Sequence, residues 1–257
     1  MTHNVVLRAL LGKVFKQPIH KWHKLNPNHL HTHKFYIFNK EVIPAFSLEQ
    51  RVKSKDELSE YFEPRTKYGI FWIPENRLKD YVKYWKLKIK DLEEQADYLY
   101  HPVHATMFLF EANEKDQSNI ISSIINRKIN FKIDGWKLFE KDLITNSDTI
   151  TIALKASQET YKFQEYLAET LLSFIRNPIR YNNNWMGEYK ESYEKYGFPF
   201  VGNHWIPHLT VASVKNEGKT LLNEIISTPI NIENPVHGYL GLFKIFDGVH
   251  ECVHIWS

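Results

Sequence analysis

Hydrophobic positions from about residue 67 onward alternate between short apolar runs and stripes with helical spacing. Apolar runs typical of buried strands occupy Gly69–Ile73, His104–Phe110, Trp136–Glu140, Asp148–Leu154 and Trp205–Val214. Helical spacing occurs over Arg77–Gln95, Asn119–Arg127, Tyr161–Arg176 and Lys219–Ser227. The order strand–helix–strand–helix–strand–strand, followed by a comparable second half, predicts an α+β protein of two similar lobes.

Turn residues separate several of these elements. Phe131-Lys132-Ile133 leads into Asp134-Gly135, which we interpret as a turn. Asp247-Gly248 lies between two strand-like runs and predicts a hairpin of Val236–Phe246 with Val249–Trp256. The segment Tyr181–Asn203 is rich in Asn, Tyr and Gly without a clear period, so we expect a long loop.

The first 40 residues contain no acidic side chain, and six of the 13 histidines lie there. Apolar residues between Val6 and Phe15 recur at helical spacing and predict a short basic amphipathic helix, which either packs on the body or lies on a membrane. Phe35–Phe38 reads as a strand. We treat residues 1–60 as a basic N-terminal extension that can contact nucleic acid or an anionic membrane surface.

The overall composition is that of an ordinary soluble globular protein, with 43% hydrophobic and 25% charged residues in 257. A net charge of +3 is too small to indicate a nucleic-acid partner by itself. The single cysteine, Cys252, excludes an intramolecular disulfide and a cysteine-built zinc site, and it fits a reducing, cytoplasmic location. No run reaches the roughly 18 apolar residues of a membrane span, so we expect no transmembrane segment, and we expect a monomer.

Two triplets carry the candidate chemistry: His104-Ala105-Thr106 and His208-Leu209-Thr210. A proline precedes each triplet, and an apolar run follows each. In a strand, a His and a Thr two positions apart share one face. A chain with 13 histidines yields such triplets by chance. A function is therefore indicated by the matching context, the preceding proline and the following apolar run. The alternative is a pair of buried histidines, each satisfied by a neighbour.

A duplicated His-x-Thr, each on a strand, resembles the 2H phosphoesterase superfamily. That superfamily includes 2′-5′ RNA ligase-like proteins and 2′,3′-cyclic nucleotide phosphodiesterases. Trp205–Ala212 is similar to its second motif and Tyr100–Phe110 to its first. The resemblance covers about residues 67–257, and it implies two antiparallel sheets, with helices outside, facing each other across a central cleft. Residues 1–60 have no counterpart in it, and Tyr181–Asn203 is longer than expected.

The resemblance implies hydrolysis of a 2′-linked or 2′,3′-cyclic phosphodiester of a nucleotide or RNA end, without metal or cofactor. His104 and His208 would divide the roles of base and acid, because imidazole populates both forms near neutral pH. Thr106 and Thr210 would donate hydrogen bonds to the non-bridging phosphate oxygens. The nucleotide base would stack on aromatic rings. The candidates for this role are Trp205, Phe198, Trp185, Tyr189, Tyr193 and Tyr196.

Two other interpretations remain open at this point. The spacing of the N-terminal histidines is compatible with a zinc or nickel site, whose ligands would be His20, His23, His29, His31 and His33. Alternatively, the same fold binds RNA or another phosphate ligand without turnover.

Overall fold

The structure is a computed structural model that describes residues 35–38, 41–44, 65–175, 187–215, 217–246 and 248–256. The chain divides into two compact units between Glu63 and Pro64. In the first unit, β1 (Phe35–Phe38) pairs antiparallel with β2 (Glu41–Pro44), which confirms the strand predicted at 35–38. The amphipathic helix predicted near the N-terminus and the five N-terminal histidines considered as metal ligands lie outside the described residues.

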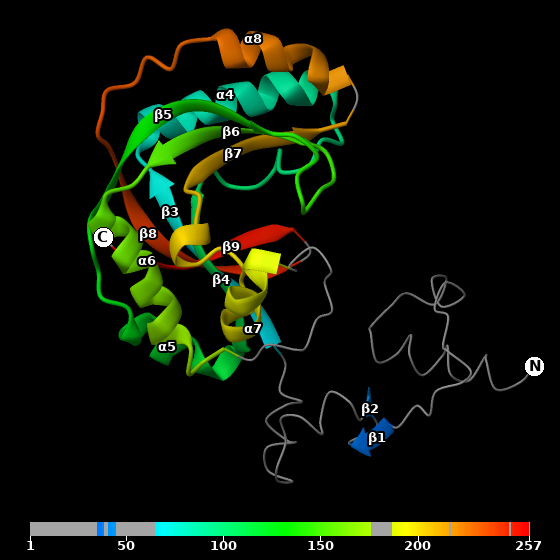
Figure 1. Cartoon of the computed structure of the whole chain (residues 1–257), viewed down its shortest axis with the longest axis vertical. Coiled ribbons are helices and arrows are strands. Elements are labelled where there is room, and N and C mark those ends of the chain that lie inside the picture. The colour runs from blue at the N-terminus through cyan, green and yellow to red at the C-terminus, as the bar shows by residue number, and fades with distance from the viewer. Residues whose placement is uncertain are drawn as a thin grey trace, which may run out of the picture. The chain divides into compact units, whose positions relative to one another are not determined.

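The second unit is built on one seven-stranded sheet in which all paired neighbours are antiparallel. Its strands are β3 (Arg65–Pro74), β4 (Ala105–Asn113), β5 (Ile129–Phe139), β6 (Asp148–Lys155), β7 (His208–Val214), β8 (Val236–Phe246) and β9 (Val249–Trp256). The strand order is β4-β3-β8-β5-β6-β7, and β9 adds to β8 (Figure 1). The strands that carry the two triplets, β4 and β7, are therefore the two ends of this order.

Strand β5 connects the two parts of the sheet. Its first residues, Ile129–Phe131, pair with β8, and the remainder pairs with β6. The turn predicted at Asp134-Gly135 is wrong. The strand continues through these residues with a bulge between Ile133 and Gly135, and Gly135 has a φ of +100°. A glycine at positive φ lets a strand bend without ending, so the same residues that suggest a turn here redirect one long strand.

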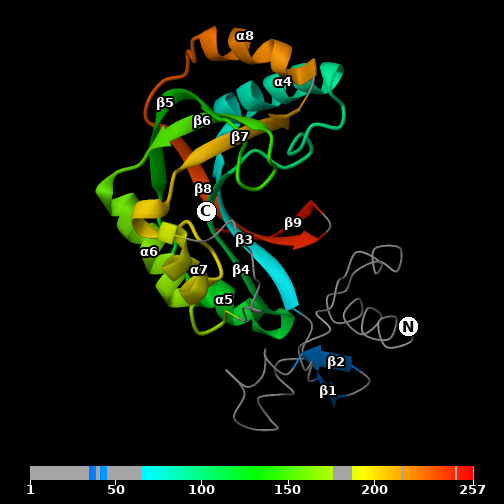
Figure 2. The same ribbon diagram turned by 45° about the vertical axis from the view of Figure 1, so that its right-hand side comes forward.

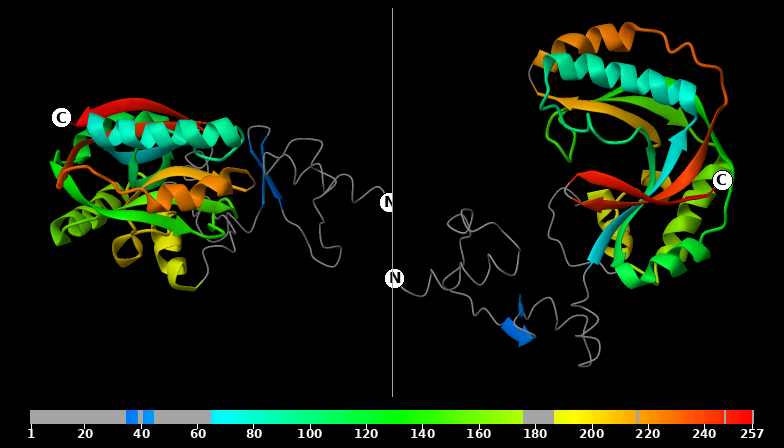
Figure 3. Two further views of the ribbon diagram at one scale, coloured as in Figure 1. Left: turned by 90° about the horizontal axis from the view of Figure 1, so that it is seen from above. Right: turned by 180° about the vertical axis from the view of Figure 1, so that it is seen from behind.

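Two repeats each place a long helix between two strands: β3–α4–β4, and β6–α6 followed by β7 after a shorter helix, where α4 is Asn76–Leu92 and α6 is Gln158–Leu171. Helix α4 packs against β7, and α6 packs against β4, so each helix covers a strand of the other repeat (Figures 1 and 3). Helix α4 also contacts β5: Trp85 of α4 meets Trp136 of β5 edge to face, with ring centroids 6.2 Å apart. The α+β class and the antiparallel pairing expected from the sequence are thus observed, and both repeats share one hydrophobic core. The strands form one seven-stranded sheet where two separate sheets were expected, and the central cleft stays a prediction.

Three shorter α-helices complete the described part, which has five α-helices altogether: α5 (Gln117–Ser123), α7 (Lys190–Tyr196) and α8 (Leu222–Ser227). Short 3-10 segments occupy Glu114–Asp116, Gly187–Tyr189, Gly202–His204 and Glu217–Leu221. Helix α8 and the β8–β9 hairpin confirm the elements predicted there, and α5 is shorter than expected (Figure 2). No helix among the described residues is long and apolar enough to cross a membrane.

The long loop predicted over Tyr181–Asn203 is wrong for its described residues, 187–203. Helix α7 forms there and ends at Gly197, which has a φ of +68°. Tyr196 is buried, and its hydroxyl donates a hydrogen bond to Glu169 of α6. Burial against α6 stabilises a seven-residue helix that helical periodicity alone does not reveal, because one buried turn leaves little pattern.

Candidate functional site

The two His-x-Thr triplets have the same local structure. In each, the His and Thr are half-buried and the residue between them is buried, so His104 and Thr106 share one face and His208 and Thr210 share another. A β-bulge follows each motif Thr: the pairing with β3 passes over Met107, and the pairing with β6 passes over Val211. Bulges bend a strand and re-aim its side chains, and they are common beside active sites.

Both motif histidines make the same hydrogen bond to the chain two residues earlier. His104 Nδ1 lies 2.7 Å from the carbonyl oxygen of Pro102, and His208 Nδ1 lies 2.7 Å from that of Ile206. A carbonyl only accepts, so Nδ1 carries the proton in both rings. The neutral imidazole then presents Nε2 as an unprotonated nitrogen, which is the form a general base requires.

Two reciprocal contacts bring the motif segments together. The indole Nε1 of Trp205, three residues before His208, donates to the carbonyl oxygen of Thr106 at 2.8 Å. Conversely, Asp97, on the segment that leads to His104, exchanges two 3.0 Å backbone hydrogen bonds with Ser213 of β7. The approach to each motif is therefore fixed on the strand that carries the other.

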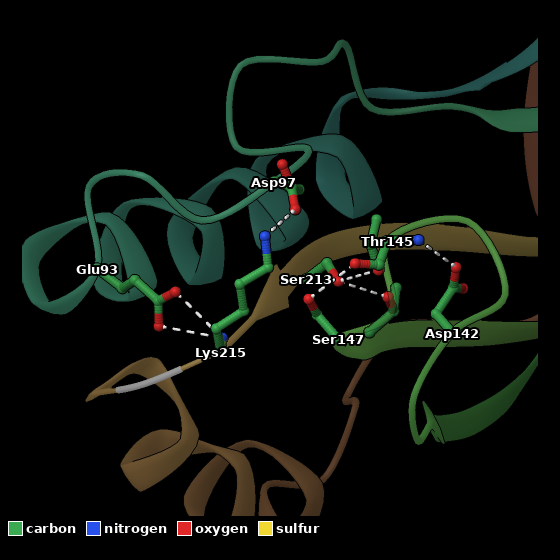
Figure 4. A network of polar contacts seen from close by, with 8 residues as sticks. Glu93, Asp97, Asp142, Thr145, Ser147, Ser213 and Lys215 are labelled. Carbon is green, nitrogen blue, oxygen red and sulfur yellow. Dashed lines mark hydrogen bonds and ion pairs between the residues drawn. The ribbon is translucent and has the colours of Figure 1, made fainter. Parts of the chain in front are cut away.

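A polar network reinforces the second of these contacts (Figure 4). Lys215 pairs with Asp97 at 3.3 Å, and the Lys215 amide donates to the Glu93 carboxylate. On the other side, the Ser213 hydroxyl lies 2.7 Å from that of Thr145 and accepts from Thr149 at 2.8 Å. Because Ser213 is fully buried, these bonds stabilise the end of β7 and the segment that crosses it.

Each motif histidine also packs against a phenylalanine of another strand. The His104 ring stacks on Phe71 of β3 with centroids 3.8 Å apart, and the His208 ring lies 5.3 Å from Phe139 of β5. Burial lowers the pKa of His104 to about 3 and also lowers the pKa of His208. Lys137 lowers the His208 pKa further, whereas Asp142 opposes that shift. Both rings are therefore neutral at pH 7 in the free protein.

The fold of the chain is similar to that of two solved structures. A structure described as a phosphoesterase matches at 8% identity over 75% of this chain and 98% of that chain, with a TM-score of 0.39. The structure of E. coli LigT complexed with NADP+ matches at 10% identity over 76% of this chain and 97% of that chain, with a TM-score of 0.36. No protein-family model and no curated protein sequence matches the chain.

Further histidines lie beside His104 that the motif analysis missed. His101 and His250 have ring centroids 4.4 Å apart, and the His250 ring lies 5.6 Å from that of His104. His250 belongs to β9 and is not followed by a threonine two positions on. Nothing in its local sequence marks it as functional, because the pairing of β9 with β8 brings it here.

The structure corrects the proposed base-stacking role of Trp205 and Phe198. Trp205 is 3% exposed and packs against Phe131 and Tyr161, while its indole nitrogen bonds to Thr106. Phe198 is 7% exposed and packs on Phe108. Neither ring has a free face for a base, so Trp205 holds the motif strands together instead.

Metal ligation was the other chemistry considered for histidines. Within the described ranges, no group of three or more His, Cys, Asp or Glu side chains is arranged to hold a metal ion. The N-terminal histidines fall outside those ranges, so the metal site suggested by their spacing stays a prediction.

Proposed function

We propose that the protein is a metal-independent phosphodiesterase that hydrolyses a 2′-linked or 2′,3′-cyclic phosphodiester of a nucleotide or RNA end. The observation that carries the proposal is the identical presentation of two histidines on cross-connected strands. In each, the histidine Nδ1–H donates a hydrogen bond to a backbone carbonyl and a threonine two residues on shares its face of the strand. A bulge directly follows that threonine. Two buried structural histidines would have no reason to share all three features.

The reaction requires one proton acceptor and one proton donor on opposite sides of phosphorus. In our scheme the Nε2 of one motif histidine takes a proton from water, and the water oxygen bonds to phosphorus. The bond from phosphorus to the ribose oxygen breaks, and the second histidine, in its protonated form, gives its proton to that oxygen. Thr106 and Thr210 donate hydrogen bonds to the non-bridging oxygens, where negative charge accumulates. The product is a phosphomonoester.

The low pKa values of the free protein suit this scheme once substrate binds. The acid must be protonated, and burial disfavours that form of both rings. A phosphodiester anion placed against the imidazoles raises their pKa, because an opposite charge nearby favours the charged form. Substrate binding and protonation of the acid are therefore coupled.

Hydrolysis of a panel of 2′,3′-cyclic nucleotides and 2′-5′-linked dinucleotides, with and without EDTA, tests the proposal. We expect turnover of at least one compound in EDTA. His104→Asn and His208→Asn should each lower kcat/KM by a factor on the order of 10² to 10⁴, the usual contribution of a general acid or base. His237→Asn is the matched control, because His237 is exposed and its ring contacts Asn130 instead of either motif.

Near-normal rates in both motif variants would remove these histidines from the mechanism. Loss of activity in EDTA that zinc restores would overturn the metal-independent scheme. Tight binding of nucleotide phosphates by the wild type without turnover of any diester would favour the non-catalytic ligand-binding alternative.

A further inference from the structure

The third histidine, His250, is prepared in the same way as the two motif histidines. Its Nδ1 lies 3.1 Å from the carbonyl oxygen of Gly248, again two residues earlier. The carbonyl fixes the proton on Nδ1, so Nε2 is left for a partner. His250 comes from β9, the outer strand of the hairpin that extends β8 (Figure 2).

His250 lies among residues of the His104 side of the site. Its ring centroid is 4.4 Å from that of His101, 5.6 Å from that of His104 and 5.6 Å from that of Phe71. Phe71 in turn stacks on His104. Phe71 therefore contacts both His104 and His250. The imidazoles of His104 and His250 are close enough to contact adjacent groups of one ligand.

The charges around His101 and His250 are predominantly positive. Lys86 of α4 is only 6% exposed, and its Nζ donates to the carbonyl oxygens of Tyr98 at 2.6 Å and His101 at 3.0 Å. Both partners are uncharged, so its positive charge is solvated by dipoles and not neutralised. Lys67 of β3 adds a second positive charge that acts on His101 and His250. The carboxylate that faces His101 is Asp97, and Lys215 already pairs with it.

We propose that His250 and His101 form a second anion subsite beside His104, which takes a further phosphate group of the nucleotide whose diester is cleaved. The proposal rests on the proposed function, which identifies the group bound at His104 as the scissile phosphodiester. A buried, unneutralised positive charge and two closely spaced imidazoles favour a dianion over a neutral sugar or base. The preferred substrate would thus carry a phosphate in addition to the scissile one.

Occupation of this subsite should be coupled to proton uptake. Burial and the two lysines keep both imidazoles neutral. The pKa of His101, which the neighbouring His250 lowers further, is lowered to about 4, and that of His250 is also lowered. A bound phosphate reverses the local field and raises both pKa values. At neutral pH the complex should therefore bind a proton that the free protein lacks.

Isothermal titration calorimetry of the full chain with adenosine 2′-monophosphate and adenosine 2′,5′-bisphosphate tests this, in two buffers that differ in ionisation enthalpy. The wild type should bind the bisphosphate on the order of 10-fold more tightly, as one charge-assisted hydrogen bond would give, with greater proton uptake. His250→Gln should lose most of this ratio. His250→Lys should keep the preference but lose the extra proton. His254→Gln, on the same strand with its ring on Trp256, is the control and should behave as the wild type.

An equal loss of affinity for both nucleotides in His250→Gln would place this side chain against a group that they share, and would overturn the anion subsite. An unchanged affinity ratio, or a wild type that binds neither nucleotide, would overturn it as well. Calorimetry measures binding and not turnover, so a protein that hydrolyses no diester but keeps the His250-dependent ratio would refute the proposed function alone.

Discussion

At the scale of the residue, the hydrogen bond from a histidine Nδ1 to the carbonyl two positions earlier recurs at His104, His208 and His250. The acceptor is a backbone carbonyl, so the bond needs no partner side chain and leaves no sequence motif. It decides which nitrogen can react, and it holds the ring against rotation. Burial then keeps the two motif rings neutral until an anion arrives.

For the proposed phosphodiesterase, this arrangement predicts the pH dependence of catalysis. The profile of kcat/KM reports pKa values of the free enzyme, where those of both motif histidines are lowered. Because the acid must be protonated, kcat/KM should be largest below the ordinary histidine pKa of about 6.5 and fall as the pH rises. The bound anion raises the pKa of the acid, so the decline of kcat should come at a higher pH. Initial rates at saturating and limiting substrate measure the two profiles, and coincident profiles would contradict the coupling.

At the scale of the element, the site depends on contacts between β4 and β7, the strands at the two ends of the strand order. One of these contacts is the hydrogen bond from the Trp205 indole to the Thr106 carbonyl, and the other is the backbone pairing of Asp97 with Ser213. Trp205→Phe keeps an aromatic ring but leaves the Thr106 carbonyl without its donor, which should cost about 1–3 kcal/mol of unfolding free energy. It should also lower kcat more than it changes KM, because the motif strands lose their register to each other.

Trp136→Phe is the matched control for that substitution. The Trp136 indole donates to the carbonyl oxygen of Thr228 at 2.8 Å, on the α8 side of the sheet. This variant should lose a comparable amount of stability in urea unfolding and retain its kcat. If both variants lower kcat equally, the indole bond at Trp205 contributes stability alone and does not position the motifs.

Elements whose own residues carry the folding signal could be predicted from the sequence. The apolar runs of β4 and β7 and the Asp-Gly hairpin of β8 and β9 are examples. The continuation of β5 through Asp134-Gly135 and the existence of α7 could not, because each depends on a partner distant in the chain. In both cases tertiary contacts decide between local conformations of similar free energy.

At the scale of the whole molecule, the same distinction separates the two parts of the site. His104, Thr106, His208 and Thr210 could be found from their spacing within the chain. His250, His101 and Lys86 could not, because their proximity arises from β9 pairing with β8 and from α4 lying beside the segment that leads to His104. A motif search detects residues that share a strand, whereas the sheet brings together residues from several strands.

The half-buried histidines make the stability of the molecule depend on pH. In the native state the pKa of His104 is lowered to about 3 and that of His101 to about 4, whereas in the unfolded chain both titrate near 6.5. As the pH falls below about 6.5, the unfolded chain binds protons that the native protein does not, so the free energy of unfolding decreases. Each histidine contributes at most about 1.4 kcal/mol per pH unit until its native pKa is reached.

Urea unfolding of the wild type and of His104→Gln at pH values from about 7 to 4.5 measures this contribution, since carboxylates and other shared groups cancel in the difference. Glutamine takes up no proton, so the curve of the variant should be shallower, and the stability of the two proteins should converge or cross as the pH falls. His237→Gln, which removes an exposed histidine, is measured alongside as the control. If the wild type and His104→Gln give parallel curves, the native state binds a proton at His104 as readily as the unfolded chain does. Burial would then not be what keeps this ring neutral, and the coupling between substrate binding and protonation would lose its basis.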